Sequence, residues 1–73
     1  MLMFDTQLHW KNLGDLWYAK AGEHNYILEY EGKQVRTQDF SLYEDLEAIR
    51  NDWHSHSFWY DDPIERAIEI IQA

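Results

Sequence analysis

His54 and His56 have the H-x-H spacing at which two side chains can bind one transition-metal ion. A complete zinc site needs two further ligands, which would have to come from Asp61, Asp62 or His24. Because two histidines at this spacing often occur by chance on a protein surface, we predict neither a metal nor another cofactor. A small metal-dependent hydrolase that uses His54, His56 and Asp61 is kept as an alternative.

Other catalytic arrangements find little support in the sequence. Ser55 and Ser57 lack the strand–turn–helix elbow and the glycine-lined oxyanion loop that activate a serine nucleophile. Pairs of carboxylates can act as general acid and base, but this requires a cleft that raises the pKa of one of them. A chain of 73 residues has little depth for such a cleft. We therefore expect no catalytic residues and no enzymatic activity.

Acidic residues dominate the charge of the chain. Fourteen Asp and Glu residues against six Lys and Arg residues give a formal net charge of −8. This charge disfavours direct binding to nucleic acid and to anionic lipid, which are themselves negatively charged. The sequence also contains no apolar run long enough to span a membrane. The partner expected from the charge is a basic protein.

The acidic residues are distributed over a predicted helix, the loop after it and the start of the next helix. The simpler interpretation is a solvated surface whose charge aids solubility. The functional interpretation is an anionic surface that docks onto a basic groove built for nucleic acid. Carboxylates on adjacent helical turns lie about 5–6 Å apart, which approximates the spacing of phosphates along DNA. The candidate residues are Glu44, Asp45, Glu47, Asp52, Asp61 and Asp62.

Phe58-Trp59-Tyr60 is a continuous aromatic run within that loop. The three side chains cannot all point inward, so we expect one to be buried and at least one to be available to a partner. Trp and Tyr beside charged residues are typical of protein–protein hot spots. Trp59 and Tyr60 are therefore the predicted anchors for a partner.

Two amphipathic helices are predicted in the second half of the chain. Ser41 and Glu44 have the S-x-x-E spacing of a capping box, and an apolar stripe at helical period follows, which predicts a helix over 41–53. Asp62 as the cap and Pro63 at the first helical position predict a second helix that reaches the C-terminus. The stripe of the first helix consists of Leu42, Leu46, Ile49 and Trp53.

A β-hairpin is predicted upstream of these helices, because apolar and polar residues alternate with a period of two on both sides of Gly32. The turn can lie at Gly32-Lys33 or at Glu31-Gly32. Both turns leave Val35 on the same face as Leu28, because the slip between the two preserves parity.

The predicted order of elements defines an α+β fold. Residues 13–19 are predicted to form a third strand, and residues 5–12 a short N-terminal helix. The sequence therefore predicts a single domain over 1–73, in which a three-stranded antiparallel meander packs with two C-terminal helices. The absence of cysteine, and of a basic secretory leader in residues 1–10, predicts a cytoplasmic location.

The first predicted helix ends in Arg50-Asn51-Asp52-Trp53, and the loop after it ends in Tyr60-Asp61-Asp62. This chain resembles small acidic phage anti-CRISPR proteins. In those proteins a hairpin leads into an amphipathic helix with a basic-Asn-x-Trp end, and a loop rich in aromatic and acidic residues follows. The resemblance covers roughly residues 26–69, whereas His54, His56 and the run of Phe58 to Tyr60 depart from the family. It implies an inhibitor that occupies the DNA-binding groove of a type II CRISPR effector nuclease as a DNA mimic.

Charge and resemblance together predict a non-enzymatic inhibitor of a basic nucleic-acid-binding protein, acting in the host cytoplasm if the protein is phage-encoded. An antitoxin or immunity protein that neutralises a basic toxin is an alternative that the same surface would serve. Aromatic residues make up 16% of the chain. Such a surplus on a small domain is also typical of a two-fold interface, so a homodimer is a further expectation.

Overall fold

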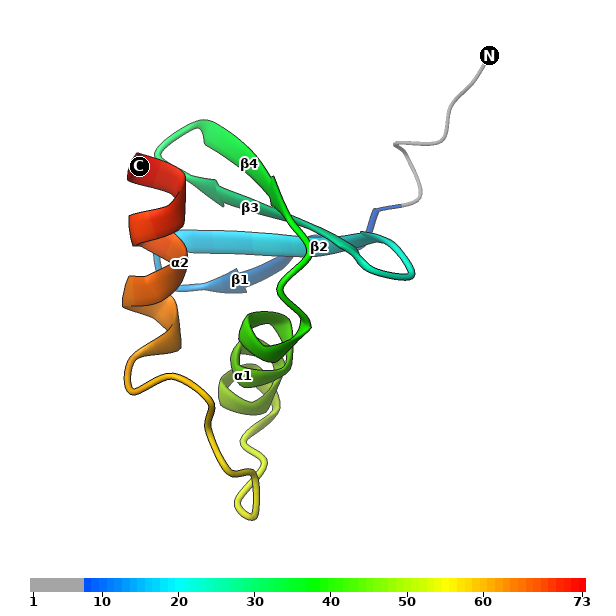
Figure 1. Ribbon diagram of the computed structural model, residues 1–73, viewed down its shortest axis with the longest axis vertical. Coiled ribbons are helices and arrows are strands. Elements are labelled where there is room, and N and C mark those ends of the chain that lie inside the picture. The colour runs from blue at the N-terminus through cyan, green and yellow to red at the C-terminus, as the bar shows by residue number, and fades with distance from the viewer. Residues whose placement is uncertain (1–7) are drawn as a thin grey trace.

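The computed structural model describes residues 8–73, which form four strands followed by two helices (Figure 1). The strands make one antiparallel sheet in the order β1-β2-β3-β4. The predicted α+β class and the antiparallel meander are confirmed, but the sheet has four strands instead of three. The elements are β1 (Lys11–Leu13), β2 (Leu16–Gly22), β3 (Asn25–Tyr30), β4 (Lys33–Thr37), α1 (Phe40–Asn51) and α2 (Pro63–Gln72).

The additional strand results from a tight turn at Gly14. This glycine has φ +65°, a left-handed conformation that a residue without Cβ adopts at little cost. The chain reverses there, so that Leu13 of β1 pairs with Leu16 of β2. The segment 13–19, predicted as one strand, is therefore the end of one strand, a turn and the start of another.

The predicted N-terminal helix over 5–12 is wrong where the structure describes it. Lys11 and Asn12 belong to β1, and residues 8–10 have no regular secondary structure. Residues 5–7 lie outside the described residues. Pairing of Lys11, Asn12 and Leu13 with β2 makes this segment a strand at the sheet edge.

The hairpin of β3 and β4 turns at Glu31 and Gly32, the second of the two turns considered. Their φ values are +51° and +85°. Two positive φ angles in a two-residue turn match the right-handed twist of the flanking strands. Leu28 pairs with Val35 in this register, so both side chains lie on one face, as expected for either turn.

The first helix begins with a different cap from the one predicted. Oδ1 of Asp39 accepts a hydrogen bond from the backbone N–H of Leu42 at 3.1 Å, so Asp39 is the N-cap and Ser41 lies inside the helix. At the other end, Asp52 adopts the left-handed conformation with φ +57° and stops the helix. Trp53 therefore lies beyond α1 and is exposed, and the apolar stripe ends before it.

The second helix begins as predicted. Asp62 is the N-cap and accepts a hydrogen bond from the backbone N–H of Glu65 at 3.1 Å, and Pro63 occupies the first helical position. Ala67 and Ile71 are buried on its inner face. Neither helix in residues 8–73 has the length and apolar character needed to cross a membrane.

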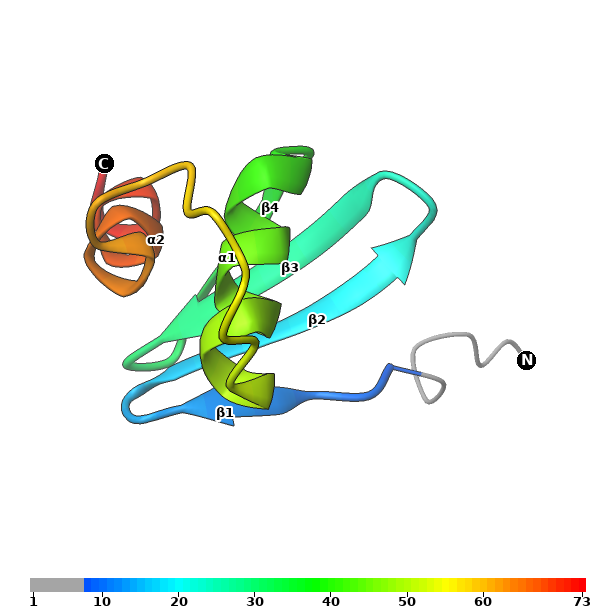
Figure 2. The same cartoon turned by 90° about the horizontal axis from the view of Figure 1, so that it is seen from below.

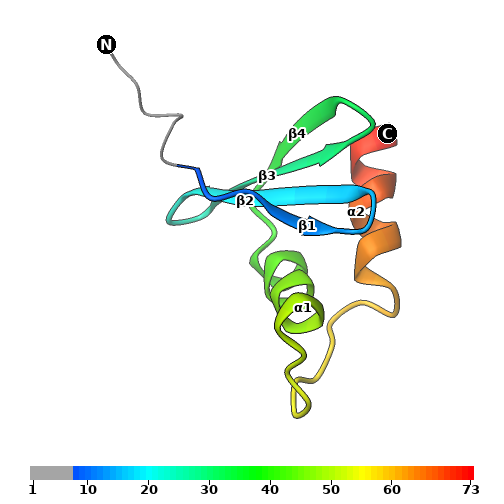
Figure 3. The same cartoon turned by 180° about the vertical axis from the view of Figure 1, so that it is seen from behind.

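Both helices bury side chains against the same face of the sheet. In the view from below, α1 lies across the strands and α2 stands beside one end of them (Figure 2). Alternate strand residues point to this face and meet the inner faces of the helices. The opposite face carries Trp17, which is 43% exposed, and neither helix covers it (Figure 3). The central cluster of buried side chains is Leu16, Tyr18, Leu28, Leu42, Leu46, Ala67 and Ile71.

Candidate functional site

Asp45 is a fully buried carboxylate on α1 that holds the α1–α2 loop, residues 52–62. It accepts hydrogen bonds from the backbone N–H groups of Trp59 at 3.0 Å and Tyr60 at 2.9 Å, and it pairs with Nε2 of His56 at 2.8 Å. A buried carboxylate is tolerated only where such partners replace water. Asp45 therefore positions the loop, and its predicted role as an exposed partner contact is wrong.

The position of Asp45 along α1 could have indicated that its side chain is buried. Asp45 lies three residues after Leu42 and one residue before Leu46, so it borders the apolar stripe. Both leucines are fully buried. A carboxylate at this border lies close to the core and, once buried, needs donors from another segment, which the loop supplies.

Phe58 and Trp59 are exposed on the loop, at 47% and 65% of their surface. The indole Nε1–H of Trp59 donates a hydrogen bond to Oε1 of Glu44 at 3.1 Å, while Asp45 holds the backbone of the same residue. Trp59 is thus held at its backbone N–H and at its indole N–H, while most of its surface remains exposed to solvent. The expectation that part of the aromatic run is exposed is confirmed.

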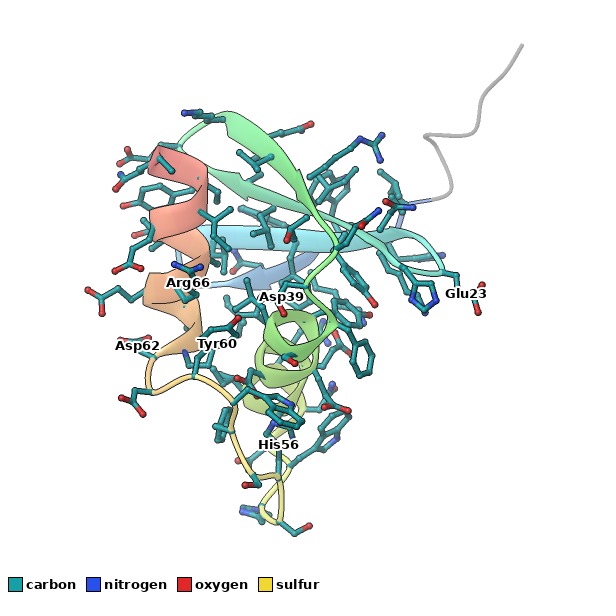
Figure 4. All side chains as sticks on the ribbon, in the orientation of Figure 1. Glu23, Asp39, His56, Tyr60, Asp62 and Arg66 are labelled. Carbon is teal, nitrogen blue, oxygen red and sulfur yellow. The ribbon has the colours of Figure 1, made fainter. Side chains whose placement is uncertain are left out.

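Tyr60 turns inward and is only half-buried, so none of the three aromatics is fully buried. Its hydroxyl donates a hydrogen bond to Oδ2 of Asp39, and the guanidinium of Arg66 lies 5.9 Å from its ring centroid (Figure 4). This hydrogen bond, and then burial, raise the pKa of the Tyr60 phenol above its ordinary value. Tyr60 therefore joins the loop to the N-cap of α1, which leaves Trp59 as the exposed anchor candidate.

Glu47 belongs to a network between α1 and the sheet. Its Oε2 accepts hydrogen bonds from Nζ of Lys11 and from the hydroxyl of Tyr18, both at 2.7 Å. Burial alone would raise the pKa of Glu47, but these two hydrogen bonds and the charges of Lys11 and Arg50 outweigh it and hold the pKa below its ordinary value. Glu47 thus acts as a contact within the fold and presents little surface to a partner.

The depressed pKa of Glu47 predicts a specific loss of stability in acid. Glu47 contributes stability above its unfolded-state pKa of about 4.3, and this contribution is lost as the pH falls through its lower folded-state pKa. Urea unfolding from neutral to acidic pH should therefore show wild type and Glu47→Gln differing most at neutral pH and converging in acid. Glu23→Gln, at an exposed position, is the control and should track wild type. A difference between wild type and Glu47→Gln that is constant with pH would contradict the assignment.

The two loop histidines have separate roles. His54 is exposed and lies 3.5 Å from a carboxylate oxygen of Asp52, whereas His56 is largely buried and its Nε2 contacts Asp45. Within residues 8–73, no group of three or more His, Asp or Glu side chains is placed to hold a metal ion. The described part of the chain therefore does not assemble His54, His56 and Asp61 into the ligand set of a hydrolase.

The other residues that were predicted to bind a partner lie at the surface of α1 and of the loop. Asp61 and Asp62 are exposed and directly follow the anchored Trp59-Tyr60 pair, and Asp52 is exposed where the loop begins. The loop extends beyond α1, away from the sheet (Figure 1). The acidic loop surface, as we call it, consists of Glu44, Asp52, Trp59, Asp61 and Asp62.

These features define a small α+β domain with a four-stranded meander and a fixed, acidic, tryptophan-bearing loop. Comparison with protein-family models, curated proteins and solved structures found no match for this chain. The resemblance to anti-CRISPR proteins therefore depends on the sequence pattern alone, and the function has to be argued from the acidic loop surface.

Proposed function

We propose that this protein is a non-enzymatic inhibitor, similar in action to anti-CRISPR proteins, that binds the basic nucleic-acid-binding surface of a nuclease by mimicking the charge of DNA. The observation that carries the proposal is the exposed Trp59, hydrogen-bonded to Glu44 and followed by Asp61 and Asp62. In this proposal the carboxylates guide a cationic partner, and the indole is the anchor that becomes buried in the complex.

The uneven distribution of charge supports this proposal. Residues 40–73 contain eight of the fourteen acidic residues but only two of the six Lys and Arg residues. Asp45 and Glu47 are used inside the fold, while Asp52, Asp61 and Asp62 remain exposed. An uneven distribution of charge orients the encounter with an oppositely charged groove and raises its rate.

The rigidity of the loop also supports binding. Asp45 fixes the backbone at Trp59 and Tyr60, and the Tyr60 hydroxyl fixes the same segment to Asp39. A loop that is already ordered loses less conformational entropy on association than a mobile one. Such preorganisation is expected of an inhibitor that must compete with a highly charged duplex.

Competition with DNA tests the proposal directly. The protein is added to a panel of guide-loaded type II effector nucleases, and the binding and cleavage of target DNA are measured at increasing salt. We expect displacement of DNA from at least one nuclease, with an association rate that falls steeply as salt screens the opposite charges. No inhibition across the panel, or an association rate independent of salt, would contradict the proposal. A nuclease target would place the protein in the host cytoplasm.

A further inference from the structure

A cavity of about 480 Å³ lies beside β1, β2 and α1, and none of its lining residues belongs to the acidic loop surface. The residues that line it are His9, Lys11, Lys20 and Tyr43. Its volume is within the range of sites that hold small molecules. Three of these four side chains carry basic groups, although the chain has only six Lys and Arg residues and a net charge of −8.

The basic groups around the cavity differ in how far they are already satisfied. Nζ of Lys11 is paired with Glu47 at 2.7 Å, so its charge is balanced within the fold. Lys20 is exposed and forms no ion pair with any residue in 8–73. His9 is also exposed, and its imidazole offers an N–H donor in either protonation state. Lys20 and His9 are therefore the groups free to bind an anion.

Tyr43 is the aromatic residue that lines the cavity, and two further tyrosines pack against it. The ring of Tyr43 stacks on that of Tyr26 with centroids 4.4 Å apart and an interplanar angle of 16°. It also meets the edge of Tyr18 at 5.9 Å, and both Tyr18 and Tyr26 are buried. Tyr43 is thus held from behind and offers a fixed aromatic surface, against which a planar ring can pack.

We propose that this cavity binds a small aromatic molecule that carries an oxyanion, either a phosphate or a carboxylate. Lys20 and His9 donate to the oxyanion, and the ring of the ligand packs against Tyr43. Charge-assisted hydrogen bonds supply the preference for an anion, and the aromatic wall supplies the preference for a ring. This site is independent of the proposed nuclease binding, because the two share no residue.

Titration followed by amide chemical shifts tests the site with four probes: phenyl phosphate, benzoate, inorganic phosphate and phenol. We expect phenyl phosphate or benzoate to produce saturable shifts centred on His9, Lys11, Lys20 and Tyr43, and the stronger of the two identifies the oxyanion. Phenol has the aromatic ring without the oxyanion, and inorganic phosphate has the oxyanion without the ring. Each should therefore bind at least about tenfold more weakly than the better aromatic anion.

A pair of lysine variants separates this site from general attraction of anions. Lys20→Gln should weaken the better aromatic anion about tenfold, and Lys33→Gln, at an exposed lysine of β4 outside the cavity, should leave its affinity unchanged. Both positions are exposed, so both variants should retain the amide spectrum of the folded protein. The proposal is overturned if no probe gives localised shifts, if phenol binds as tightly as the anions, or if the two variants behave alike.

Discussion

Replacement of Asp45 by alanine is expected to lower the free energy of unfolding by about 3 kcal/mol and to release the α1–α2 loop. The substitution leaves the N–H groups of Trp59 and Tyr60, and the ring of His56, without the buried acceptor that they share. For a domain of this size the loss corresponds to a fall in melting temperature of roughly 12–24 °C. Urea unfolding measures the stability, and amide exchange at Trp59 and Tyr60 reports the release of the loop.

Two further variants identify the cause of that loss. Asp45→Asn keeps the size of the side chain but turns one acceptor into a donor facing backbone N–H groups, so it should recover little of the stability. Asp61→Ala removes the same charge from an exposed position and should change stability by less than about 0.5 kcal/mol. If Asp45→Ala and Asp61→Ala are equally stable, Asp45 does not anchor the loop.

Replacement of Trp59 by alanine should have the opposite profile, with a small effect on stability and a large one on binding. The ring is 65% exposed, so little buried area is lost on truncation. A tryptophan anchor contributes about 2 kcal/mol or more to an interface, which corresponds to a loss of affinity for the nuclease of roughly 30-fold. Calorimetric titration of the variant against the inhibited nuclease measures this loss.

Trp17→Ala is the matched control for that experiment. Trp17 is also a partly exposed tryptophan, at 43%, but it lies on the sheet face that the helices do not cover. Its removal should leave nuclease affinity within about threefold of wild type, since residues away from the anchor are energetically near neutral. Equal losses for the two tryptophans would assign the effect to general surface hydrophobicity and exclude Trp59 as a specific anchor.

Local chemistry accounts for the parts of the fold that were predicted correctly from sequence. The cap at Asp62 and the proline after it define the start of α2 without tertiary information. The period-two alternation of side chains along the strands places Val35 on the same face as Leu28 for either turn. By contrast, Gly14 is compatible with either a helix stop or a hairpin turn, and only pairing between β1 and β2 decides between them. Ser41 does not cap α1, because the helix begins at Phe40 and Asp39 accepts the hydrogen bond from the backbone N–H of Leu42.

The candidate site was predictable in composition but not in the roles of its members. Acidic and aromatic residue types identified the α1–α2 loop, and Trp59 and Asp61 are exposed there as expected. The inward orientation of Asp45 and Glu47 depends on donors from distant segments, and that of Tyr60 on an acceptor, Asp39, in another segment. A count of charges treats all carboxylates alike, whereas the fold uses Asp45 and Glu47, both predicted to bind a partner, as internal acceptors.

We propose that binding to the nuclease depends on the position of the charges more than on their number. Asp52→Asn/Asp61→Asn/Asp62→Asn removes three charges from the acidic loop surface, with Asn suited both to the left-handed φ at residue 52 and to the cap at residue 62. Asp15→Asn/Glu23→Gln/Glu31→Gln removes three exposed charges from the turns of the sheet, of which Glu23 lies far from the loop (Figure 4). Both triple variants therefore carry the same net charge, three units less negative than −8.

The most direct measurement is the dissociation constant of these two triple variants for the inhibited nuclease, at low and at physiological salt. The account predicts that the loop variant binds at least roughly 30-fold more weakly than wild type and loses most of the salt dependence, while the sheet-turn variant stays within about threefold of wild type. Equal affinities for the two variants would contradict it, because the interaction would then depend on net charge and not on the acidic loop surface.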